Sequence, residues 1–172
     1  MPVTTILIGG DIPDALVDDM ARRALASGYG QDGEGRAVLD HAAHFRECAS
    51  AGRPVALTRI DPVFVRNRPP PMPLHAFLAD ASVRFKAVRH PSEGVDGRVE
   101  VWTPRTGAAA MAADIRGEPL LDLAGIGDRR RATGASGEGA DGELLRHLVK
   151  RMQAIRENPG PAVLVGPAPR PG

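Results

Sequence analysis

Cysteine and aromatic residues are scarce in this chain. Cys48 is the only cysteine among 172 residues, so no disulfide can form within the chain, and a zinc site made of cysteines alone would need other chains. Phenylalanine, tryptophan and tyrosine together make up 3% of the residues. Because aromatic rings form the stacking platforms of single-strand nucleic-acid binders, a base-stacking surface is hard to build from this sequence.

Long apolar runs are also missing. No stretch reaches the roughly 18 consecutive apolar residues that a membrane-spanning helix requires, and the first ten residues lack the basic segment of a secretion signal. We therefore expect a cytoplasmic protein without membrane contact. The length of 172 residues and the 42% hydrophobic content are typical of one globular domain. We predict a single domain over residues 1–166 and a disordered tail at 167–172.

Charge is spread unevenly along the chain, although the formal net charge is only +1. Residues 1–50 carry 8 acidic and 4 basic side chains, whereas residues 51–172 carry 13 acidic and 18 basic ones. The front part is therefore acidic and the rest is basic. Only Lys86 and Lys150 among the 22 basic residues are lysines, an imbalance that we attribute to genomic base composition.

The first sixty residues show the pattern of a crossover between two parallel strands. The expected elements are a strand at 3–8, helices at 11–28 and 37–49, and a strand at 55–60. Gly9 and Gly10 form the turn after the first strand, and Asp11 is the expected N-cap of the first helix, which Gly28 closes. Two strands separated by helices favour a parallel pair.

Farther along, alternating apolar and polar residues at 83–88 and 98–102 predict an antiparallel hairpin. The other expected elements are a short helix at 108–115, a strand at 119–124, a flexible loop at 127–140, a helix capped by Asp141 and a strand at 162–165. The last helix has an apolar stripe that we expect to pack on the core: Leu144, Leu145, Leu148, Val149, Met152 and Ile155. The predicted fold is a single-domain layered α/β fold with a mixed, mainly parallel sheet flanked by helices, plus the antiparallel hairpin.

The strand ends offer one candidate catalytic site. If the strands at 3–8 and 55–60 are parallel neighbours, Asp11 and Asp61 both emerge at the carboxyl edge of the sheet, where open α/β sheets bind ligands. The two carboxylates would hold Mg²⁺ or share a proton, with Gly9 and Gly10 as the cofactor-binding turn beside them. The competing interpretation, which we favour, is that Asp11 caps a helix and Asp61 begins a turn.

His41, His44 and Cys48 share one side of the second predicted helix. They span about 10 Å of helix rise, so binding all three to one zinc ion would be strained, although a two-ligand site completed elsewhere stays open. As a nucleophile, Cys48 is poorly placed near a helix C-terminus, where the macrodipole opposes a thiolate. We favour packing or local hydrogen bonds for these residues.

Basic residues are concentrated near the C-terminal end of the chain: Arg129, Arg130, Arg131, Arg146, Lys150 and Arg151. Such a patch can hold phosphate groups electrostatically. Acidic residues such as Asp128, Glu138 and Glu143 are interleaved with it, and aromatic residues are missing nearby. We therefore do not expect nucleic-acid binding and interpret the patch as a solvated helix face.

No complete catalytic motif is present in the sequence. Gly134 and Gly139 have the outer spacing of a phosphate loop, but Ala140 and Asp141 follow where the motif needs a lysine. The favoured hypothesis is a non-catalytic accessory protein that binds a protein partner or its own copies. Two alternatives stay open: a metal-assisted, phosphate-directed small-ligand enzyme that uses Asp11 and Asp61, and a nucleic-acid binder that uses the last helix. The sequence identifies no cofactor.

Overall fold

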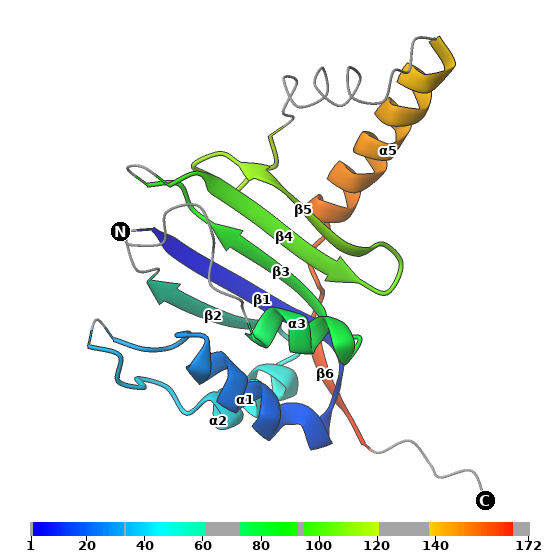
Figure 1. The fold of residues 1–172 in the computed structure, drawn as a ribbon. Coiled ribbons are helices and arrows are strands. Elements are labelled where there is room, and N and C mark those ends of the chain that lie inside the picture. Colours follow the sequence, from blue (N-terminus) through cyan, green and yellow to red (C-terminus); the bar gives the residue numbers. More distant parts are fainter. Residues whose placement is uncertain (1, 33, 61–72, 93–94, 121–137, 167–172) are drawn as a thin grey trace, which may run out of the picture.

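Figure 1 shows the computed structural model, which describes residues 2–32, 34–60, 73–92, 95–120 and 138–166. Within these residues the strands are β1 (Val3–Pro13), β2 (Val55–Ile60), β3 (Arg84–Arg89), β4 (Gly97–Thr103), β5 (Gly107–Ala113) and β6 (Ala162–Val165). The helices are α1 (Val17–Ala26), α2 (His41–Ser50), α3 (Pro73–Asp80) and α5 (Glu138–Arg156). A short 3-10 turn, η1 (Asp14–Leu16), precedes α1.

The sheet is mostly antiparallel, so the predicted mainly parallel sheet is wrong. Its strands follow the order β2-β1-β3-β4-β5, and each neighbouring pair in this order is antiparallel. In the register of β1 and β2, Val3 lies opposite Ile60 and Ile8 lies opposite Val55. The crossover prediction failed because two helices connect these strands: α1 and α2 contact each other and return the chain to the end of the sheet that it had left.

The first strand is longer than the apolar run that predicts it. β1 continues through Gly9 and Gly10 to Pro13, and its second half pairs in parallel with β6, where Gly10 lies opposite Ala162 and Pro13 opposite Val165. This confirms the expected strand at 162–165. β1, near the N-terminus, therefore pairs with β6, near the C-terminal end of the described chain (Figure 1).

Asp11 does not cap the first helix, which is a correction to the predicted element. It is an exposed residue of β1, and α1 begins six residues later, after Leu16, with no side-chain cap. Ile12, which was expected on the helix, is instead fully buried in the strand opposite Leu164. Pairing with a strand from the far end of the sequence overrides the local cap signal. Gly28, at φ 80°, follows the end of α1 as expected.

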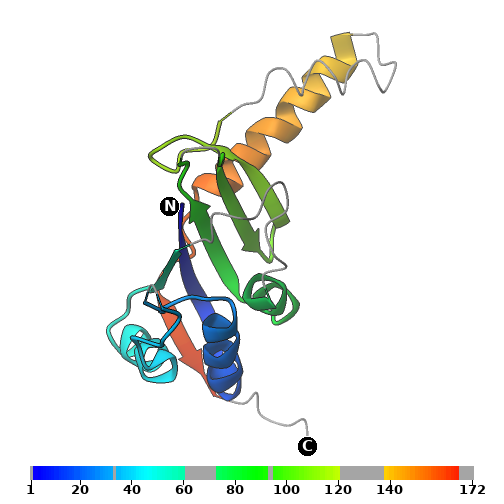
Figure 2. The ribbon, with the colours of Figure 1, turned by 60° about the vertical axis from the view of Figure 1, so that its left-hand side comes forward.

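The helices cover two faces of the sheet. Phe85 and Ala87 of β3 belong to a large core with α1, α2 and α3, whereas the adjacent Val88 packs in a second, smaller core with Ile155 of α5. Because successive residues of a strand point to opposite faces, α5 lies on the face opposite α3. In Figure 2, α1 and α2 lie at one end of the molecule and α5 at the other.

The antiparallel hairpin of the sequence analysis is confirmed as β3 and β4, but the helix predicted at 108–115 is wrong. Residues 108–113 belong to β5, which pairs with β4 along its whole length. Alanine favours a helix by less than about 1 kcal/mol per residue, and the turn before Gly107, which has φ 65°, directs the chain back along β4. Of the strand expected at 119–124, a bridge between Ala113 and Pro119 is present, and residues 121–124 lie outside the described residues.

The loop and tail predictions fall mainly outside the described part of the chain. Residues 127–137 and 167–172 are not described, whereas residues 138–140 belong to α5. Asp141 therefore lies within a helix that begins at Glu138 and does not cap it. In the described ranges, no helix is both long enough and apolar enough to cross a membrane.

Candidate functional site

The parallel strand pairing that was expected to place Asp11 and Asp61 at one edge of the sheet is not what the structure shows, because β1 and β2 are antiparallel. Asp61 lies outside the described residues, but Ile60 beside it is opposite Val3, at the far end of β1 from Asp11. Eight residues of strand separate Val3 from Asp11, which corresponds to about 27 Å. The parallel pairing on which the site depended is wrong. Among the described residues, no group of three His, Cys, Asp or Glu side chains is arranged to hold a metal ion.

Gly9 and Gly10 have a structural reason for being small. A Cβ atom on Gly9 would overlap the backbone carbonyl oxygen of Gly160, just before β6. The backbone N–H of Gly10 donates to the Pro161 carbonyl at 2.8 Å, and Gly10 has φ 75° with the Arg84 side chain next to it. The two glycines therefore admit the chain that leads into β6.

His41, His44 and Cys48 each have a local contact in α2. The Nε2 atom of His41 donates to the Tyr29 carbonyl at 2.8 Å, and that of His44 donates to the Ala56 carbonyl at 3.2 Å. A ring nitrogen that carries this proton has no lone pair for a metal ion. Cys48 is 2% exposed and its sulfur lies 3.6 Å from His44 Nε2. These contacts support the packing interpretation.

Sequence reasoning missed a polar network that connects α3 to the sheet. His75 of α3 is buried, with Nε2 3.0 Å from the Tyr29 hydroxyl and Nδ1 3.5 Å from Glu100 Oε2 on β4. The His75 imidazole at this distance lowers the pKa of Glu100, although burial opposes this effect. Tyr29 is fully buried, and the His75 side chain is 6% exposed, whereas that of Glu100 is 32% exposed. We assign it a structural role that no spacing in the sequence indicates.

The predicted basic patch is divided in the structure. Arg129, Arg130 and Arg131 lie outside the described residues. Of the helical members, Arg146 donates to the Gly142 carbonyl of its own helix at 3.1 Å, whereas Arg151 donates to the Ala110 carbonyl of β5 at 2.9 Å. Lys150 and Arg151 line a groove beside β5 that Arg146 does not line, although Arg146 lies one helical turn before Lys150.

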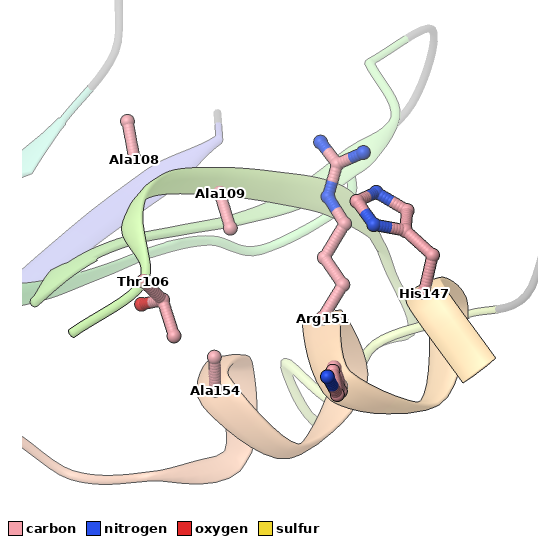
Figure 3. A pocket seen from close by; sticks show the side chains of 7 residues that line it. Thr106, Ala108, Ala109, His147, Arg151 and Ala154 are labelled. Carbon is pink, nitrogen blue, oxygen red and sulfur yellow. The ribbon is translucent and has the colours of Figure 1, made fainter.

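This groove lies between β5 and α5 and is shown in Figure 3. It has a volume of about 320 Å³. Its basic side chains all come from α5: His147, Lys150 and Arg151. The other lining residues have small side chains: Thr106, Ala108, Ala109 and Ala154. In Figure 3, Arg151 extends from the helix toward the strand. The groove thus combines positive charge with a floor that lets another chain approach closely.

β5 is the last strand in the order of the sheet. Near the C-terminal end of β5, the Leu120 N–H donates to the Ala112 carbonyl. Since outward backbone groups alternate along a strand, those of Ala108 and Ala110 also face this outer edge. Along the groove, the Arg151 side chain bonds to this edge, and no further strand among the described residues pairs with it. A strand edge of this kind can pair with another extended segment.

The other side of α5 carries the apolar stripe of the sequence analysis, and most of it does not pack on the core. Leu145 is 60% exposed and Val149 is 44% exposed, while Leu148 and Met152 are half-buried. Ile155, at the end of the stripe, is fully buried. Leu144 lies outside the described side chains. The expectation that the whole stripe packs on the core is therefore wrong.

Compared with known proteins, the chain matches no family model, no curated protein and no solved structure.

Proposed function

We propose that this protein is a non-catalytic binding protein, and that it takes an extended, carboxylate-bearing segment of a partner polypeptide along β5, beside α5. The observation that carries the proposal is the outer edge of β5, with which no described strand pairs along the groove, next to three basic side chains of α5 that line the same groove. An added strand gains main-chain hydrogen bonds from the edge, and side-chain contacts then give it specificity.

The two halves of the groove have separate roles in this proposal. The outward N–H and carbonyl of Ala108 and the outward N–H of Ala110 hydrogen-bond the incoming segment, whereas the Ala110 carbonyl already accepts from Arg151. The segment approaches closely because both alanines have small side chains. Lys150 and Arg151 attract its carboxylates. Exposed ion pairs contribute only about 0–1 kcal/mol each, so charge selects the partner while backbone pairing supplies most of the affinity.

Nucleic-acid binding is a weaker explanation of the same charges. The residues that line the groove include no phenylalanine, tyrosine or tryptophan ring on which a base could stack. Arg146, which would extend the positive surface, bonds to its own helix.

An enzymatic role also has less support. The Thr106 hydroxyl lies 2.6 Å from Thr103 Oγ1, and Figure 3 shows it at the other end of the groove from His147. The groove thus lacks a paired nucleophile and base.

A synthetic peptide of alternating valine and glutamate, labelled with a fluorophore, tests the proposal by fluorescence anisotropy. We expect salt-dependent binding that Lys150→Glu weakens by about tenfold. The matched control is Arg22→Glu, the same charge change at an exposed residue of α1, at the other end of the molecule from α5 (Figure 2), which leaves the affinity nearly unchanged.

Two further peptides separate strand addition from simple charge attraction. Lysine in place of glutamate removes the charge complementarity, and proline in place of valine removes backbone donors while all carboxylates remain. Both peptides should fail to bind. Equal binding of the proline peptide, or equal loss of affinity in Lys150→Glu and Arg22→Glu, would reject the proposal.

A further inference from the structure

The apolar stripe of α5 lies on the opposite side of the helix from the groove. At about 100° per residue, Leu145, Leu148, Val149 and Met152 form one face, and the groove residues His147, Lys150, Arg151 and Ala154 form the other. The stripe and the groove are therefore separate surfaces, and the inference below does not rest on the proposed function.

The charges of α5 indicate what covers this stripe. The first six residues of the helix include Glu138, Asp141 and Glu143, and its last seven include Lys150, Arg151 and Arg156. A second copy of this helix that lies antiparallel places each acidic end beside a basic end, whereas a parallel copy places like charges together. Helix α5 is thus complementary in charge to its own reversed copy.

The position of the stripe fits the same arrangement. Leu148 and Val149 stand near the middle of α5, between Leu145 on one side and Met152 on the other. In an antiparallel pair centred there, Leu145 of each copy meets Met152 of the other. The result is a two-fold, self-complementary contact in which one surface is used by both copies.

We propose that two copies of this protein associate through α5, with their apolar stripes in contact and their helices antiparallel. Leu145 and Val149, which are exposed in the single chain, become buried in the pair. At the ends of the contact, Asp141 of each copy is in register with Arg156 of the other. Arg156 lies 4.0 Å from Glu118 of its own chain, and both side chains of that pair are more than 60% exposed.

Sedimentation velocity over about a hundredfold range of concentration tests the association. We expect the wild type to reach twice the chain mass of 18.1 kDa, and Leu145→Ser/Val149→Ser to weaken the association at least about tenfold. Because both residues are exposed, this variant should keep the wild-type circular dichroism. Val38→Ser is the matched control, since Val38 is 66% exposed on a different element. A wild type that stays a monomer throughout overturns the proposal.

Charge reversal tests the pairing of the helix ends. Asp141→Arg and Arg156→Glu should each weaken the association. The double variant should restore it, whereas neither single variant should. Absence of recovery overturns the antiparallel register.

Cysteine crosslinking distinguishes antiparallel from parallel helices, and Cys48 does not interfere because it is buried. Val149→Cys lies near the two-fold axis and should crosslink to its own copy. Gly142→Cys, whose copies would be about 20 Å apart along an antiparallel pair, should not. Efficient self-crosslinking at both positions would indicate parallel helices and contradict the proposal.

Discussion

The guanidinium of Arg151 donates to the Ala110 carbonyl at 2.9 Å, which connects α5 to the outer edge of β5. The two residues are 41 positions apart in the sequence, so the bond holds the helix against the sheet at one side of the groove. Arg151 is partly buried, whereas Arg146 bonds a carbonyl of its own helix from an exposed position.

We therefore expect Arg151→Met to lower the free energy of unfolding by about 1–2 kcal/mol, because the apolar stem remains but the Ala110 carbonyl loses its donor. Arg146→Met is the control and should change it by less than about 0.5 kcal/mol. Urea denaturation of the two variants measures the difference. Equal effects would mean that the bond between helix and strand contributes nothing specific.

The apolar residues of α5 differ in what they contribute to the stability of a single chain. Ile155 is fully buried against Val99 and Val101, whereas Leu145 is 60% exposed. Ile155→Ala should cost roughly 2–5 kcal/mol, and Leu145→Ala should cost less than about 0.5 kcal/mol. Both are measured by thermal or urea unfolding at a protein concentration where the chain is monomeric. A large cost for Leu145→Ala in the monomer would show that the stripe packs within its own chain.

Local patterns predicted the elements that depend on their own residues. The strand at 55–60 has the same bounds in the structure, the hairpin of β3 and β4 is correct, and the strand at 162–165 is correct. Each has alternating or β-branched residues between turn signals. Such signals are sufficient when the pairing partner is next in the chain or when a short run ends at proline and glycine.

Signals from distant residues explain the errors. Asp11 and Pro13 resemble the start of a helix, but Ile12 is buried by pairing with Leu164, about 150 residues later. The alanines at 108–113 favour a helix, but β4 supplies a complete set of strand partners. The parallel assumption in turn placed Asp11 beside Asp61. Neither the β5 edge nor the Tyr29–His75–Glu100 network has a local pattern, because each arises from elements brought together by the fold.

Close approach at Gly9 gives a prediction about the junction of β1 and β6. Gly9→Ala places a methyl group against the backbone carbonyl of Gly160, which cannot move as a side chain does. We expect a loss of about 1–3 kcal/mol in the free energy of unfolding. Gly142→Ala is the control: Gly142 has open space around it in α5, so the same change should stabilise the chain by roughly 0.5–1 kcal/mol. If both variants changed the free energy of unfolding in the same direction, the close contact between Gly9 and the Gly160 carbonyl would not be what requires a glycine at position 9.

The pair of His75 and Glu100 gives a prediction about the dependence of stability on pH. The His75 imidazole 3.5 Å away, together with the charge of Arg98, lowers the pKa of Glu100 below its ordinary value of 4.5, although burial opposes the shift. A carboxyl group with a lowered pKa in the folded state binds protons less readily there than in the unfolded chain. Its contribution to stability is therefore present above about pH 4.5 and is lost as the pH falls through the lowered folded pKa.

We expect the wild type to be more stable than Glu100→Gln near neutral pH, and the difference between them to shrink as the pH falls below 4.5. Glutamine keeps nearly the same size and can still bond to His75, so the variant removes mainly the titrating charge. Urea unfolding of both proteins at a series of pH values measures the difference directly. A difference that stays constant across this range would mean that Glu100 is not stabilised as a carboxylate by its contact with His75.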